Sequence, residues 1–66
     1  MRVNINGDPG ELPDGTTVDD VVVQLGKGRK GLAVAVNDEV VSRSRWTTTA
    51  LAEDDRVEIL TAAQGG

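Results

Sequence analysis

The sequence predicts an α+β domain in which one main helix lies across one face of a four- or five-stranded sheet. Segments that alternate polar and apolar residues, typical of half-buried strands, flank a single stretch with helical spacing of its apolar residues. Their order is ββαββ, then a loop, then a last strand. A single helix buries its apolar stripe by packing on one face of such a sheet.

The first elements are a predicted hairpin. Residues 2–6 alternate polar and apolar, and the turn-forming run Asn6–Gly10 should reverse the chain. Glu11–Pro13 is then expected as a short return strand. Because Pro13 has no N–H to donate, this strand is expected at the edge of the sheet or to stop there.

The helix is expected to begin after Thr17, which can cap it, with Asp19 and Asp20 near the positive end of its dipole. One helical face carries Val18, Val21, Val22 and Leu25. The consecutive valines favour a strand by propensity, but periodicity and capping favour a helix. Gly26 and Gly28 are expected to end it.

Residues 32–36 alternate large and small apolar side chains, which predicts a strand with its alanines, Ala33 and Ala35, on the side away from the core. A turn at 37–38 and a short strand at 39–41 should follow.

An irregular segment, 42–54, is expected next, with Trp46 and Leu51 covering the open end of the core. Residues 56–61 read as the last strand. We expect one domain over residues 1–61.

The composition argues against an enzyme. The chain has 66 residues and contains neither histidine nor cysteine, which removes histidine-based triads, zinc sites with these ligands and disulfides. A core of this size leaves little room for a ligand cavity, so we expect no bound cofactor.

The charge indicates the kind of partner. The net charge of −4 opposes nucleic-acid binding and suits a basic protein partner, although it also serves simply to keep a small domain soluble. The sequence shows no secretory signal and no apolar run long enough to span a membrane, so we expect a cytoplasmic protein that is a monomer by itself.

The C-terminal pair Gly65-Gly66 is the best candidate for chemistry. A terminal glycine has no Cβ, so its carboxylate can enter a narrow slot in another protein. No pattern in residues 62–66 would anchor them, and we expect a flexible tail.

Several stretches, in order, resemble one family: the hairpin Val34–Val41, the Arg43–Trp46 stretch with its Arg-x-x-Trp spacing, Leu51, the strand start Asp55–Ile59 and the tail Thr61–Gly66. Together they are similar to ThiS-type sulfur carrier proteins of thiamine biosynthesis, in the ubiquitin-like β-grasp superfamily. Two departures are Ser42, where the family often has proline, and Asp54, where it often has glycine. Asp tolerates the left-handed conformation that this turn would need.

The resemblance implies a β-grasp fold in which the first and last strands pair in parallel. It also implies that an E1-like adenylyltransferase uses ATP to adenylate the Gly66 carboxylate. A sulfur donor derived from cysteine desulfurase then converts it to a thiocarboxylate, which thiazole synthase accepts. Gly65, Gln64 and Ala63 would thread into partner sites, or serve only as an ordinary linker.

The sequence also suggests a docking face. Ala33, Ala35 and Leu60 should point away from the helix, and Arg43, with Arg45, could meet a partner's carboxylates. The plainer interpretation is that these apolar residues are exposed singly, as is common on protein surfaces, and that the arginines are simply solvated.

Four other functions remain open at this point, one of them a thiocarboxylate carrier for cysteine or another sulfur-containing metabolite. The small subunit of molybdopterin synthase shares the fold and the thiocarboxylate, but the absence of Phe and Tyr and of proline before the glycines favours the thiamine branch. A ubiquitin-like modifier would use the same terminal chemistry. A plain interaction domain would not use it at all.

Overall fold

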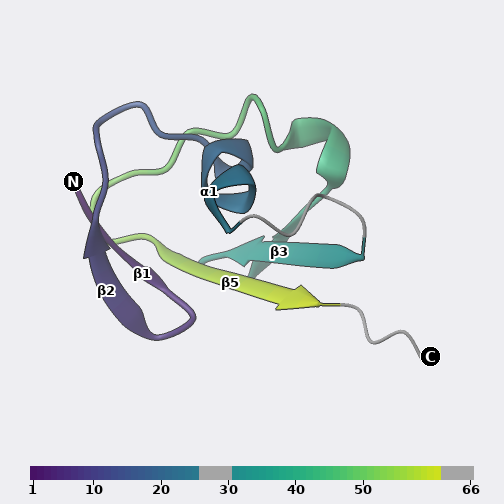
Figure 1. Ribbon diagram of the computed structural model, residues 1–66, viewed down its shortest axis with the longest axis horizontal. Helices are drawn as coiled ribbons and strands as arrows, with labels where there is room; N and C mark the ends of the chain where they lie inside the picture. Colours follow the sequence, from purple (N-terminus) through teal and green to yellow (C-terminus); the bar gives the residue numbers. More distant parts are fainter. Residues whose placement is uncertain (26–30, 62–66) are drawn as a thin grey trace.

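The computed structural model describes residues 1–25 and 31–61, and in them it shows a mixed five-stranded sheet with a helix across one face (Figure 1). The elements are β1 (Arg2–Ile5), β2 (Asp8–Glu11), α1 (Val18–Gln24), β3 (Leu32–Val36), β4 (Glu39–Val41), the 3-10 helix η1 (Arg43–Arg45) and β5 (Arg56–Thr61). Their spatial order in the sheet is β2-β1-β5-β3-β4. The predicted fold class is confirmed.

The last strand of the chain lies at the centre of the sheet. β5 pairs in parallel with β1, through Asn4 with Arg56 and Ile5 with Val57. On its other side β5 pairs antiparallel with β3, and β1–β2 and β3–β4 are antiparallel hairpins. The parallel pairing of the first and last strands is the one that the β-grasp resemblance implies.

The predicted turn over Asn6–Gly10 is too long. Only Asn6 and Gly7 make the turn, with φ values of 53° and 86°, and β2 begins at the next residue. Pro9 fits within this strand because β2 lies at the edge and because its partner Asn4 donates its N–H to the Asp55 carbonyl, just before β5. The return strand therefore starts and ends earlier than predicted.

Helix α1 begins at the predicted cap. Thr17 Oγ1 accepts the Asp20 N–H at 3.2 Å, and the Asp20 carboxylate accepts the Thr17 N–H at 3.0 Å. These two bonds form a capping box, which satisfies two of the N–H groups that a helix start leaves unpaired. The predicted stop signals, Gly26 and Gly28, lie outside the described residues.

The core lies between α1 and the sheet. Its buried apolar side chains are Val3, Val18, Val21, Val22, Val34, Trp46, Leu51, Val57 and Ile59. Trp46 is 1% exposed, and its indole N–H donates to the Val41 carbonyl at 2.9 Å. Both Trp46 and Leu51 are therefore core residues, as predicted.

Most of the segment 42–54 is irregular, as expected, apart from η1. Asp54 has φ of 71°, in the left-handed region, and its N–H donates to the Arg2 carbonyl at 2.7 Å. The turn thus forms without glycine, which agrees with the tolerance of Asp for this conformation.

Candidate functional site

Strand β5 leads to the candidate reactive terminus. Its last residue, Thr61, is the register partner of Leu32 in β3. Gly66, Gly65, Gln64 and Ala63 lie outside the described residues, as does the rest of the predicted tail. The roles of these four residues stay predictions. The structure does show the end of β5, from which the segment continues, and the sheet face beside it.

The sheet face opposite α1 forms a surface that we call the outer face. It comprises Ala33, Ala35, Val40, Glu58 and Leu60. Ala33 is opposite Leu60, and Ala35 has Val40 on one side and Glu58 on the other. Alternate side chains of a strand point to opposite faces, and the intervening residues Val34, Val57 and Ile59 are buried in the core. The outer face therefore points away from the helix.

The outer face exposes large apolar side chains. Leu60 is 65% exposed and Val40 is 81% exposed. Three of the four docking residues predicted from the sequence, Ala33, Ala35 and Leu60, are thus brought together on one continuous surface. Because this surface sits on the strand that leads to the C-terminal residues, a partner docked on it would lie close to where those residues begin.

Val40 was missed by the sequence analysis. Two valines follow one another in β4, and only the register of the hairpin decides which one faces outward. Val41 pairs with the buried Val34, so Val40 must take the outer side. The signal was present in the two-residue turn Asn37-Asp38, because such a turn fixes which residues face each other.

Arg43 is not brought together with the other three docking residues. It lies in η1, and its guanidinium carbon is 6.0 Å from the centroid of the Trp46 ring, at the outer limit of a cation–π contact. Trp46 belongs to the core between α1 and the sheet, and η1 lies on the same side as α1 (Figure 1). Docking through Arg43 stays a prediction, and it would involve a different surface from the outer face.

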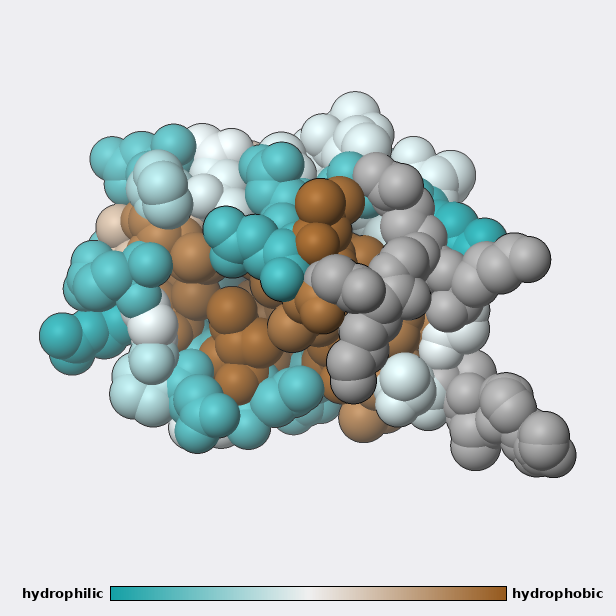
Figure 2. All heavy atoms as spheres, in the orientation of Figure 1, coloured by the Kyte–Doolittle hydropathy of each residue, from teal (hydrophilic) through white to brown (hydrophobic). Residues whose placement is uncertain are grey.

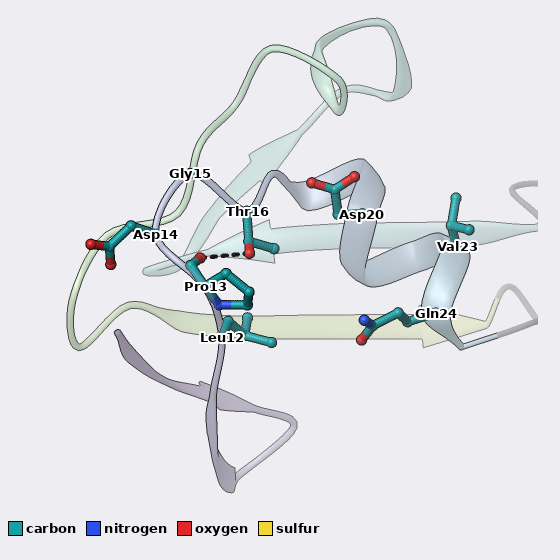
Figure 3. A pocket seen from close by; sticks show the side chains of 8 residues that line it. All are labelled: Leu12, Pro13, Asp14, Gly15, Thr16, Asp20, Val23 and Gln24. Atoms are coloured by element: carbon teal, nitrogen blue, oxygen red, sulfur yellow. Dashed lines mark hydrogen bonds between the residues drawn. The ribbon is translucent and has the colours of Figure 1, made fainter.

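An open hollow lies between the end of β2 and α1 (Figure 3). It is lined by Leu12, Pro13, Asp14, Gly15, Thr16, Asp20, Val23 and Gln24. The Thr16 hydroxyl donates to the Pro13 carbonyl at 2.7 Å, and the carboxylates of Asp14 and Asp20 point away from each other (Figure 3). Polar groups that converge on one point, which a small-molecule site needs, do not occur in this hollow.

Apolar surface also reaches the exterior between α1 and the sheet, bordered by hydrophilic side chains (Figure 2). Within residues 1–25 and 31–61, no three His, Cys, Asp or Glu side chains are grouped so that they could hold a metal ion. No helix in this described part has the length and apolar character needed to cross a bilayer.

Within residues 1–25 and 31–61, the sheet order, the single α-helix and the position of the last strand at the centre of the sheet define a ubiquitin-like β-grasp protein. The sequence model of the ThiS family matches residues 3–66, and the chain therefore belongs to the ThiS family. This confirms the expected sulfur carrier of thiamine biosynthesis, a carrier protein and not an enzyme.

Curated relatives agree with this assignment. The sulfur carrier protein ThiS of Escherichia coli is 26% identical over 66 residues, which cover 100% of both chains. The sulfur carrier protein ThiS of Thermus thermophilus is 34% identical over 62 residues, 94% of this chain and 95% of that protein. A thiazole synthase of Magnetococcus marinus is 35% identical over 66 residues, but these span only 20% of that protein's length.

Solved structures show the same fold. The crystal structure of the thiamine biosynthesis protein ThiS from Geobacter metallireducens superposes with a TM-score of 0.83 at 26% identity, covering 100% of both chains. A solution structure of a thiamine biosynthesis protein from the same organism gives a TM-score of 0.77 at 27% identity, covering 100% of this chain and 88% of that one.

Proposed function

We propose that this chain carries sulfur as a thiocarboxylate on Gly66 and delivers it to thiazole synthase. The observation that carries the proposal is the family match, which runs from residue 3 through the terminal glycines at residues 65 and 66. The absence of cysteine and histidine from the whole chain leaves the terminal carboxylate as the group best suited to hold sulfur.

The chemistry starts with activation, because a carboxylate is a poor electrophile. An E1-like adenylyltransferase joins the Gly66 carboxylate to the AMP moiety of ATP and releases pyrophosphate. Sulfur from a donor supplied by cysteine desulfurase displaces AMP, which leaves a thiocarboxylate. ATP is bound by the activating partner, so the carrier itself needs no cofactor, and we place this ATP-dependent reaction in the cytoplasm.

The terminal residues suit this role. Gly65 and Gly66 have no Cβ, so the backbone can pass through a narrow channel and the carboxylate can be approached closely. Ala63 and Gln64 would follow them into the partner's site.

The relative from Magnetococcus marinus supports thiazole synthase as the partner. That protein, a thiazole synthase, includes a region that is 35% identical to this chain over all 66 residues. A carrier-like region and a synthase in one polypeptide remain close to each other, as a carrier and the enzyme that accepts its sulfur must be during transfer.

The outer face is the surface that we propose for docking. Its small residues, Ala33 and Ala35, let a partner approach closely, and Leu60 and Val40 offer apolar area. Glu58 lies within it and the whole chain has a net charge of −4, so a basic partner would be attracted during encounter.

The deciding experiment is intact-protein mass spectrometry of the chain after incubation with its adenylyltransferase, ATP and a desulfurase with cysteine. We expect a mass increase that corresponds to one oxygen replaced by sulfur, located in the C-terminal peptide. The matched control lacks Gly66 and should show no change. Isopeptide-linked adducts in cells, with no thiocarboxylate, would instead support a ubiquitin-like modifier.

A further inference from the structure

The side chain of Asn6 continues the pairing of β1 with β5 beyond the end of β1. The Asn6 N–H donates to the Val57 carbonyl at 2.8 Å. Its side chain then bonds both backbone groups of Ile59: Oδ1 accepts the Ile59 N–H at 2.8 Å, and Nδ2 donates to the Ile59 carbonyl at 3.2 Å. In a parallel ladder the N–H and C=O of one residue bond two different residues of the partner strand, whereas here one side-chain amide serves both groups of Ile59.

These two bonds secure the part of β5 that lies nearest the C-terminus. The backbone ladder with β1 pairs Asn4 with Arg56 and Ile5 with Val57. Beyond it, Leu60 and Thr61 are paired with β3 on one side. Within residues 1–25 and 31–61, the bonds from Asn6 are therefore the ones that hold β5 from the β1 side beyond Val57.

The turn alone does not explain why Asn stands at this position. With φ of 53°, Asn6 occupies the left-handed region, which Gly and Asp also tolerate. Glycine would lack the side chain, and an aspartate carboxylate would lack the donor for the Ile59 carbonyl. An amide supplies both a donor and an acceptor, and the two bonds to Ile59 use both.

The other hairpin offers a natural comparison. Asn37 has φ of 51° at the same place in the β3–β4 turn. Its Oδ1 accepts the Arg56 N–H at 2.9 Å, and its Nδ2 donates to the Asp55 carboxylate at 2.9 Å. Asn37 therefore holds the beginning of β5, whereas Asn6 holds the region nearer its end.

We propose that Asn6 is a positioning residue for the reaction at Gly66. The pairing with β3 sets the register at the end of β5, and Asn6 adds the hold on Ile59 from the β1 side, so that the point from which the C-terminal residues continue is restrained from both sides. A fixed origin raises the fraction of docked complexes in which the carboxylate reaches the reacting phosphate. This inference rests on the proposed function, because it assumes that Gly66 is the acceptor.

The proposal predicts which kinetic constant changes. The outer face spans β3, β4 and β5, and its β5 residues Glu58 and Leu60 pair with Ala35 and Ala33 of β3, a pairing that does not involve Asn6. Docking on that face, and with it the KM for the carrier, should therefore survive loss of the Asn6 side chain. The kcat of adenylation should fall.

The test compares Asn6→Gly with Asn37→Gly, which makes the same change at the same turn position and the same φ region. Carrier-dependent ATP–pyrophosphate exchange with the adenylyltransferase gives kcat and KM. Hydrogen exchange reports the amides of Ile59 and Leu60. Both are measured at a temperature where circular dichroism shows each variant folded, and Asn6→Asp, which keeps the acceptor, is the second variant.

For Asn6→Gly we expect kcat to fall about tenfold, equivalent to about 1.4 kcal/mol, which is of the size of one or two hydrogen bonds. The KM should stay within about twofold, and exchange at Ile59 should accelerate about tenfold. Asn6→Asp should lower kcat as well. Asn37→Gly should leave kcat near the wild-type value.

The experiment distinguishes a failure of the positioning role of Asn6 from a failure of the proposed function. If the wild-type chain is adenylated but Asn6→Gly and Asn6→Asp keep its kcat, or if Asn37→Gly loses as much as Asn6→Gly, the positioning role is overturned and the proposed function stands. If wild-type carrier supports no exchange of pyrophosphate at all, the proposed function fails and the positioning role fails with it.

Discussion

Replacing Leu60 with alanine tests the outer face as the docking surface. The Leu60 side chain is 65% exposed in the free protein, so a partner that covers it buries that fraction anew. The substitution removes three carbon atoms, each worth about 0.8 kcal/mol when buried. Scaled by the exposed fraction, the loss in binding free energy is about 1.6 kcal/mol, or about 15-fold in affinity.

The assay measures the KM for the carrier in ATP–pyrophosphate exchange catalysed by the adenylyltransferase. The Kd of the complex between the carrier and the same enzyme is measured by titration calorimetry. Both constants should rise about 15-fold for Leu60→Ala while kcat stays unchanged, because the terminus and its positioning are intact. This is the opposite of the pattern expected for Asn6→Gly. Val40→Ala, at 81% exposure, should weaken binding about ninefold by the same reasoning.

Val23→Ala is the matched control, because Val23 is 55% exposed but lies on α1, on the other side of the sheet. Its Kd should equal that of the wild type. Because only about a third of Leu60 is covered in the free protein, Leu60→Ala should reduce the free energy of unfolding by less than about 1 kcal/mol. Wild-type affinity in both Leu60→Ala and Val40→Ala would refute the docking assignment.

Three further changes test other parts of the molecule. Thr17→Ala removes the helix cap and should reduce stability by about 1 kcal/mol, seen as a fall in Tm of about 4–8 °C by circular dichroism; an unchanged Tm would contradict the capping box. Trp46→Phe removes the hydrogen bond to the Val41 carbonyl and part of the core volume, and should lower the free energy of unfolding by about 2–3 kcal/mol. Urea unfolding is followed by far-UV circular dichroism, because Trp46 is the sole tryptophan and its fluorescence is lost in the variant. An unfolding midpoint equal to that of the wild type would show that the bond contributes nothing to stability. Gly66→Ala should lower the kcat of adenylation with an unchanged Kd, and equal rates would argue against a narrow slot around the terminus.

The type of nearly every element could be predicted from the sequence, because the signals for these elements are local. The Thr17 cap and the spacing of Val18, Val21 and Val22 predicted α1, the alternation of large and small apolar residues predicted β3, and the period-2 spacing of Val57, Ile59 and Thr61 predicted β5. The exceptions are η1, in a segment expected to be irregular, and the bounds of the first hairpin, where Asp8, Pro9 and Gly10 were assigned to the turn. Edge position and pairing, which are not local properties, allow them to belong to β2.

The candidate site divides in the same way. Composition and the Gly65-Gly66 pair predict a role for Gly66 without any knowledge of the fold, because they are properties of single residues and of a two-residue motif. Three other features depend on which strands pair and in which register. They are the outward direction of Val40, the separation of Arg43 from the outer face, and the bonds of Asn6 to Ile59. Asn6 and Ile59 are 53 positions apart along the chain, so only the folded sheet, in which β1 and β5 are neighbours, brings them together.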